Sequence, residues 1–246
     1  TYTATFTPDA GSASNGVISV DTSKFSDGAG NENDSAGSIT LPVDTIIPTI
    51  GITSDVTSLK AGESAVLTFT LSEESADFVE ADITASGGTI TGFSGSGTSY
   101  TATFTPTDDS TDNGEISVSA SAFSDAAGNE NDVASNTITL SVDTIPPEAP
   151  VITTTTSSTS STTPTIEGIA EAGTTVTLFI DGRSAGVNTT ADVATGAYTI
   201  TAVSRLVDGT YSFTVKATNS GGNTSSSSSE LIITLSLIHI SEPTRR

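Results

Sequence analysis

Apolar and polar residues alternate in short runs along most of this chain. Every second residue is apolar in Ala65–Leu71, and the same alternation recurs in Tyr100–Phe104, Ile116–Ala120 and Val176–Ile180. A period of two is that of a β-strand with one buried face, and no segment keeps the helical period of 3.6 over ten residues. Glycine-rich stretches and an Asn-Gly pair separate the runs as turns. The pattern therefore predicts an all-β chain of short strands.

One loop of the chain occurs twice. Phe25–Asp34 reads FSDGAGNEND and Phe123–Asp132 reads FSDAAGNEND, 98 positions later. The identity extends outward, because 23 of 33 positions agree between Tyr2–Asp34 and Tyr100–Asp132. A repeat of this length, holding about seven strands, is one whole β-sandwich rather than one turn of a solenoid.

The repeat divides the chain into domains. We predict that residues 1–44 are the C-terminal part of a truncated domain and that residues 45–143 are a complete one. Residues 144–234 form a third domain of different sequence, which opens with the proline-rich linker Ile145–Pro150. Each proline restricts its own backbone and that of the preceding residue, so this linker is expected to be extended and stiff.

The last residues, 235–246, stand apart from these domains. Leu235–Arg245 reads LSLIHISEPTR, which resembles the translation of a transposase sequencing adapter, and it contains the chain's single histidine, His239. The alternative is that this stretch extends the last strand. No chemistry is therefore assigned to His239.

Charge and composition exclude several classes of partner and site. The chain has 29 acidic and 7 basic residues, a net charge of −22. This charge repels nucleic acid and anionic membranes and attracts cations. The absence of cysteine excludes disulfides and thiolate metal sites. No apolar run is long enough to predict a membrane span.

Few residues are suited to catalysis. The sequence has no cysteine and no GxSxG or HExxH motif. Two adjacent acidic pairs, Glu73-Glu74 and Asp108-Asp109, would point to opposite faces of a strand rather than to one substrate. We predict that the protein is not an enzyme.

Several motifs resemble bacterial Ig-like repeats of giant surface adhesins of the biofilm-associated and type I-secreted kinds. In residues 45–143 these are LKAGE at Leu59–Glu63, TFTLSE at Thr68–Glu73 and the FSDAAGNEND loop. In the third domain they are DGTYSFTVKATN at Asp208–Asn219 and GGN at Gly221–Asn223. The resemblance implies tandem immunoglobulin-like β-sandwiches, secreted to the bacterial cell surface, with calcium at the domain junctions. One departure is Asn219, which stands where such domains usually have aspartate.

Calcium is the candidate cofactor because it binds carboxylate, amide and carbonyl oxygens, which the repeated loop supplies. In an Ig-like sandwich this loop joins the last two strands at the end where the chain enters. It should therefore face Asp44 and a loop after Leu71 that carries Glu73. By the same logic, Asp143 should face Asp181 and the loop Asn219–Asn223. The predicted ligands are Asp44, Glu73, Asp125, Asn129, Asp132, Asp143 and Asp181, with Asp27, Asn31 and Asp34 as their equivalents in the truncated domain.

The alternative for these loops is that Asp, Asn and Gly simply form a stable, soluble turn. For the whole chain, the leading hypothesis is a structural extender of a bacterial surface adhesin that supports cell adhesion or biofilm formation. Its partners would be neighbouring Ig-like domains of the same chain, and host or surface glycans would be bound by regions outside it. Two alternatives stay open: a module that itself binds glycans or ice, weakly favoured by Thr-x-Thr runs, and accessory domains of a large secreted enzyme.

Overall fold

The structure, a computed structural model, describes residues 2–236. Apart from one 3₁₀ turn, η1 (Glu80–Asp82), the regular elements of that range are all β-strands, which confirms the predicted all-β class. The residues form two compact units. The first contains the residues up to Thr57 together with Ser64–Thr105 and Gly114–Leu140, and the second contains Ser58–Glu63, Pro106–Asn113 and the residues from Ser141 on.

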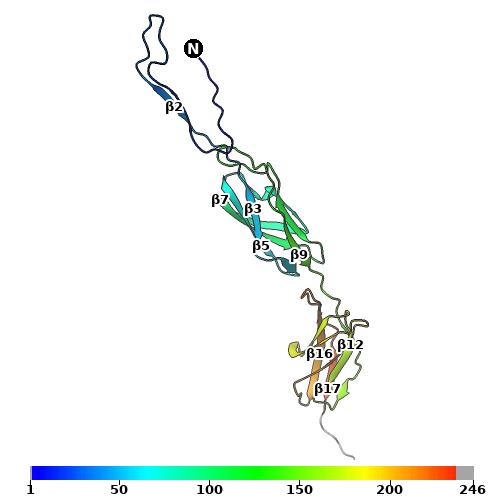
Figure 1. The fold of residues 1–246 in the computed structure, drawn as a ribbon. Coiled ribbons are helices and arrows are strands. Elements are labelled where there is room, and N and C mark those ends of the chain that lie inside the picture. The colour runs from blue at the N-terminus through cyan, green and yellow to red at the C-terminus, as the bar shows by residue number, and fades with distance from the viewer. Residues whose placement is uncertain (1, 237–246) are drawn as a thin grey trace, which may run out of the picture. The chain divides into compact units, whose positions relative to one another are not determined.

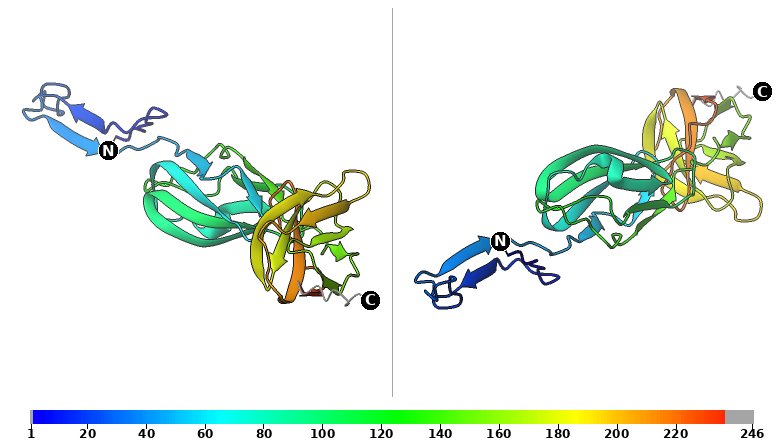
Figure 2. Two further views of the ribbon diagram at one scale, coloured as in Figure 1. Left: turned by 90° about the horizontal axis from the view of Figure 1, so that it is seen from below. Right: turned by 90° about the horizontal axis from the view of Figure 1, so that it is seen from above.

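The first two strands form a sheet of their own. β1 (Gly16–Val20) pairs antiparallel with β2 (Gly37–Leu41), and Figure 2 shows them in blue as a two-stranded ribbon. Apolar side chains beside this ribbon are exposed, and Phe25 is 65% exposed, whereas its counterpart Phe123 in the complete repeat is only 3% exposed. Within the described residues, positions 2–44 thus form one two-stranded sheet, and no second sheet packs on its apolar side chains.

The complete repeat is built from two sheets (Figure 1). Their strand orders are β3-β5-β7 and β4-β9-β8-β6, and only the β4–β9 pair is parallel. The strands are β3 (Ile50–Ser54), β4 (Ser58–Lys60), β5 (Ala65–Ser75), β6 (Ile83–Ser86), β7 (Gly88–Pro106), β8 (Gly114–Val118) and β9 (Ile138–Asp143). Alternate residues of β5 from Ala65 to Leu71 are buried, as the sequence pattern predicts.

An aromatic cluster anchors the repeated loop to the core of the first unit. Phe78 packs edge-on against Tyr100 and Phe123, with ring centroids 5.1 Å and 5.5 Å apart. The Tyr100 hydroxyl donates to the carbonyl of Ser75 at 2.8 Å. Because Phe123 is the first residue of FSDAAGNEND, its burial fixes where the loop begins.

The third domain also has two sheets, with strand orders β10-β12-β15 and β11-β17-β16-β13-β14. Its strands are β10 (Val151–Ile152), β11 (Ser158–Thr159), β12 (Thr165–Ile169), β13 (Thr175–Ile180), β14 (Arg183–Thr190), β15 (Ala197–Thr201), β16 (Gly209–Thr218) and β17 (Leu231–Leu235). Its core includes Ile166, Leu178 and Phe213. β17 runs one residue past the predicted domain end, to the buried Leu235. Residues 237–246 lie outside the described residues, so the adapter resemblance stays a prediction.

Candidate functional site

Two copies of the repeated loop share one hydrogen-bond pattern. The Asp125 carboxylate accepts bonds from the backbone N–H groups of Ala127 (2.8 Å) and Asn129 (2.9 Å), and from the side-chain amide of Asn129 (2.8 Å). In the truncated domain, Asp27 accepts the equivalent backbone and side-chain bonds from Asn31, at 3.0 Å and 2.9 Å. The motif therefore has a structural role that needs no ligand, because aspartate and asparagine hold the turn closed.

A third loop, with a diverged sequence, closes in the same way. Asn219 Oδ1 accepts from the backbone N–H of Asn223 at 2.9 Å, as Asp125 does from Asn129. Isolated antiparallel bridges join Ser124 to Glu130 and Thr218 to Thr224 in corresponding places. The loop after β16 is thus equivalent to the FSDAAGNEND loop, with a neutral amide in place of its carboxylate.

Asn131 of the motif is fully buried and acts as a scaffold. Its Oδ1 accepts from the N–H groups of Ala122 (2.8 Å) and Phe123 (3.1 Å). Its Nδ2 donates to the carbonyls of Ser119 (2.8 Å) and Val133 (3.2 Å). Both ends of the amide are therefore satisfied by the backbone of the loop itself.

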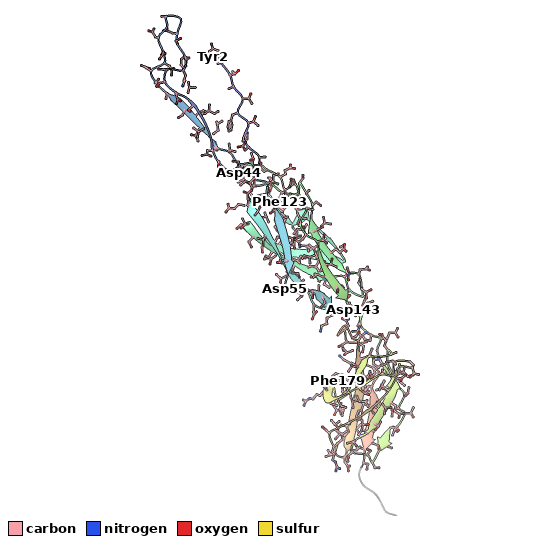
Figure 3. All side chains as sticks on the ribbon, in the orientation of Figure 1. Tyr2, Asp44, Asp55, Phe123, Asp143 and Phe179 are labelled. Atoms are coloured by element: carbon pink, nitrogen blue, oxygen red, sulfur yellow. The ribbon has the colours of Figure 1, made fainter. Side chains whose placement is uncertain are left out.

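In each complete domain the loop also contacts the linker that precedes it. The side-chain amide of Asn129 donates to the backbone carbonyl of Asp44 at 3.3 Å, and that of Asn223 donates to the carbonyl of Asp143 at 2.9 Å. Within the first unit, Figure 3 shows Asp44 and Phe123 at the same end of the complete repeat, with Asp55 at the opposite end. The loop therefore lies where the chain enters the domain, as the sequence predicts.

The threonine of each Val-Asp-Thr linker, which sequence reasoning did not single out, is a second anchor. Thr144 is 2% exposed, accepts from the N–H of Ser110 (2.9 Å) and donates to the carbonyl of Thr107 (2.8 Å). Thr45 makes the equivalent bonds to Ser12 and Asp9. The sequence did contain a clue, because Val-Asp-Thr occurs in both linkers. A threonine that recurs at the same place in each linker suggests that it makes the same hydrogen bonds in both.

Glu73 lies in β5, in an environment that disfavours its negative charge. The expectation that it sits in a loop is wrong, because β5 continues to Ser75. Burial, followed by the negative charges of Asp44 and Asp125, raises the pKa of the Glu73 carboxyl. Its Oε2 is buried and has no hydrogen-bond partner among the described residues. Two other predicted residues, Asp44 and Asp125, thus act on Glu73.

Asp181 does not join the second predicted group, and that prediction is wrong. It occupies the turn between β13 and β14, where its Oδ1 accepts from the N–H of Ser212 at 2.9 Å. Ser212 lies near the start of β16, whereas Asn219 follows its end. At about 3.3 Å per strand residue, the two positions are on the order of 20 Å apart. The antiparallel pairing of β13 with β16 puts Asp181 at the other end of the domain.

Asp132 and Asp34 of the repeated motif are exposed, and neither is among the groups that shift Glu73. Within residues 2–236, no set of three or more Asp, Glu, His or Cys side chains is already gathered closely enough to hold a metal ion. The metal role of the predicted residues therefore stays a prediction.

Family models match almost the whole chain. Residues 1–43 and 44–142 match one model described as a bacterial Ig-like domain, and residues 152–235 match a second model with the same description. The chain belongs to the bacterial Ig-like domain family. No match was found among curated proteins. No helix within residues 2–236 has the length and apolar character needed to cross a membrane.

Solved structures that resemble this bacterial Ig-like chain do so distantly. The adhesin InvE of Yersinia pseudotuberculosis is 15% identical over 76% of this chain, with a TM-score of 0.29, and the chain spans 58% of it. The fibronectin(III)-like modules of Clostridium thermocellum CbhA are 16% identical over 75% of this chain and 93% of theirs, with a TM-score of 0.39. The BSP domain of a biofilm-associated protein is 15% identical over 79% of this chain and 31% of its own, with a TM-score of 0.30. At these values the likeness carries no argument about function.

Proposed function

We propose that these tandem Ig-like domains act as a structural extender of a secreted bacterial surface adhesin, and that calcium stabilises the contact between the Asp44 linker and the FSDAAGNEND loop. The observation that carries the proposal is the recurring loop-to-linker bond, Asn129 to Asp44 and Asn223 to Asp143. A spacer needs a fixed linkage at each step, whereas an enzyme or receptor needs one unique pocket. Adhesion, biofilm formation and any glycan partner belong to the parent protein.

The calcium part of the proposal rests on Glu73. Its buried, unpartnered Oε2 lies in the negative field of Asp44 and Asp125. A buried carboxylate oxygen without a donor costs free energy, and a hard cation that accepts oxygen ligands would remove that cost. Asp44, Glu73, Asp125 and the Asn129 side chain would hold the ion, which would neutralise the repulsion between the linker and β5. The hydrogen bonds from Asn129 to Asp44 and Asp125 would hold the loop in place beside the ion.

Thermal unfolding of the full chain tests the calcium part. At calcium concentrations near 100 times Kd, binding adds about 2.7 kcal/mol, which raises the Tm of a domain of about 100 residues by on the order of 10 °C. The increase should be absent with magnesium and in Glu73→Gln. It should persist in Glu74→Gln, whose carboxylate is exposed on the neighbouring position of β5. An equal increase in wild type and Glu73→Gln would refute this site.

A replacement experiment tests the extender role. In an adhesin displayed with this chain between its anchor and its binding tip, deletion of the chain should reduce adhesion. Replacement by the same number of unrelated Ig-like domains should restore adhesion, because only separation from the surface is required. If the replacement fails while the native domains succeed, the chain is itself a binding module and the extender role is wrong.

A further inference from the structure

Asn223 connects three separate segments of the second compact unit. Its Oδ1 accepts from the backbone N–H of Ala61 at 2.8 Å, and its Nδ2 donates to the carbonyl of Asp143 at 2.9 Å. Its backbone N–H is bound by Asn219, as described above. The residue is only 2% exposed, so these bonds are shielded from water. A single side chain therefore ties the linker at Asp143 to the turn that contains Ala61.

The charges around Asn223 differ from those around Asn129. The carboxylate of Asp125 is replaced by the neutral amide of Asn219, whose Oδ1 is already bound and whose Nδ2 donates to the carbonyl of Ile145 at 3.0 Å. The Asn219 amide therefore brings no negative charge that would attract a cation. Asp181, the carboxylate expected to complete the set, lies at the other end of the domain. The donors present here do not fit a calcium ion.

A lysine supplies positive charge at this place instead. A surface groove of about 430 Å³ is lined by Lys60, Glu63, Asp143 and Gly221, among others. The Lys60 ammonium pairs with Glu63 at 3.7 Å and lies 3.2 Å from the point where a Cβ on Gly222 would stand. The Glu63 carboxylate thus already has a cationic partner, and Lys60 and Asp143 line the same groove, whereas Oε2 of Glu73 has no partner among the described residues.

Glycine lets the loop approach this closely. A Cβ on Gly221 would overlap the carboxylate of Asp143, and Gly222 has a φ of +84°, a backbone region that favours glycine. The loop backbone therefore lies directly against Asp143 and the lysine, and a larger residue at either position would separate them.

We infer that Asn223, with Lys60, forms a direct joint that fixes the linker at Asp143 without any metal ion. The chain would then combine one calcium-dependent linkage, at Asp44, with one that is independent of calcium. The contrast between the Asp44 and Asp143 linkages rests on the calcium role proposed above. The joint at Asn223 does not depend on that role. In this account, chelation loosens the Asp44 linkage alone.

The turn at Ala61 allows a selective test. Glu63 N–H donates to the Lys60 carbonyl at 3.1 Å, and Gly62 has a φ of +79°, which is the geometry of a type II turn with Ala61 at its second position. Proline is favoured at that position, and the preceding Lys60 ends β4, an extended conformation that tolerates a following proline. Ala61→Pro thus keeps the turn, but its ring Cδ replaces the N–H, which removes the donor to Asn223 and pushes the Asn223 side chain away. Ala61→Gly, which keeps the N–H, is the matched control.

Hydrogen exchange of the full chain, with calcium or with EGTA, provides the measurement. Exchange in residues 58–63 and 218–225 should be the same in both conditions. Ala61→Pro should speed exchange in residues 218–225 by roughly five- to tenfold, the loss of about one buried hydrogen bond, whereas Ala61→Gly should not. Asn223→Ala should speed exchange in both segments.

The inference is overturned if EGTA speeds exchange in residues 58–63 or 218–225, or if Ala61→Pro behaves as Ala61→Gly. A separate result addresses calcium. If residues 123–132 do not respond to calcium while the Ala61 variants behave as expected, the proposed calcium site fails and the joint stands.

Discussion

The carboxylate of Asp77 holds both hydrogen-bond donors of Ser124. Its Oδ1 accepts from the Ser124 backbone N–H at 3.0 Å and its Oδ2 from the Ser124 hydroxyl at 2.6 Å. Asp77 follows β5, and Ser124 is the second residue of the repeated loop, so the bond links β5 to the loop across 47 positions. It thereby sets where Asp125 lies relative to Glu73, and hence the electrostatics of the Asp44 linkage.

Replacing Asp77 should destabilise the first unit. Asp77→Ala removes three charge-assisted bonds, two from Ser124 and one from the Ser75 hydroxyl, but the side chain is exposed, so we expect a loss of about 1 kcal/mol in the free energy of unfolding. Urea denaturation without calcium measures it. Asp132→Ala, which removes an exposed carboxylate from the same loop, is the control and should change stability by less than about 0.5 kcal/mol. Equal effects would show that the Asp77–Ser124 bond contributes nothing.

Glu73 and Asp125 should respond to pH in opposite directions. Burial works against the charge of Asp125, but bonds from the Asn129 side chain and backbone outweigh it and hold the pKa below its usual 3.8. Its stabilisation is therefore present above that value and lost as the pH falls through the lower folded pKa. The pKa of Glu73 is raised from 4.5, so the folded state binds its proton more tightly and stability falls as the pH rises from 4.5 through the raised value.

In calcium-free buffer, lowering the pH from 7 to 4.5 should therefore raise the urea midpoint of the wild type. Glu73→Gln should start with a higher midpoint at pH 7 and lose this rise, because its neutral amide carries no repelled charge. Glu74→Gln should keep it. A rise that is the same in all three proteins would come from other groups and contradict the assignment to Glu73.

The two phenylalanines that open the repeated motif should differ sharply in their contribution. Phe123→Ala removes a buried ring from the aromatic cluster and should cost about 3–5 kcal/mol. Phe25→Ala changes the same residue in the same motif where the ring is 65% exposed, so it should cost less than about 1 kcal/mol. Chemical denaturation of both variants provides the comparison. A large cost at Phe25 would mean that its ring is covered in solution.

The linker threonines offer a second matched pair. Thr144→Val keeps the shape but leaves the Ser110 N–H and the Thr107 carbonyl without their partner, which should cost about 1–3 kcal/mol because the site is buried. Thr45→Val breaks the equivalent bonds where the residue is only half-buried and water can replace them, so we expect a smaller loss. Faster exchange of the Ser110 amide in Thr144→Val would locate the effect, and unchanged exchange would contradict it.

Local patterns predicted the parts of this structure that depend on neighbouring residues. The alternation of Ala65–Leu71 predicted the buried face of β5, and the repeated FSDAAGNEND motif predicted a loop at the end where the chain enters. Both follow from short-range periodicity and from the general order of strands in an Ig-like sandwich.

The positions of several site residues depend on contacts between segments that are distant in the sequence, which local patterns do not predict. Asp181 could not be placed without knowing that β13 runs antiparallel to β16, which sends its turn away from Asn219. Asp77 stands out only when β5 and the loop are folded together, since 47 positions separate it from Ser124. Whether Glu73 lies in a strand or a loop depends on where β5 ends. Strand ends are the feature that a sequence pattern predicts least well.

Calorimetric titration of the full chain with calcium tests the central claim most directly, because it measures binding at the Asp44 linkage rather than its consequences. The account predicts saturable binding in the wild type that Glu73→Gln abolishes and that Glu74→Gln and Asn223→Ala leave intact. Binding that is absent from the wild type, or that survives unchanged in Glu73→Gln, would contradict a calcium-stabilised linkage at Asp44 and leave the repeated loop as a turn closed by its own hydrogen bonds.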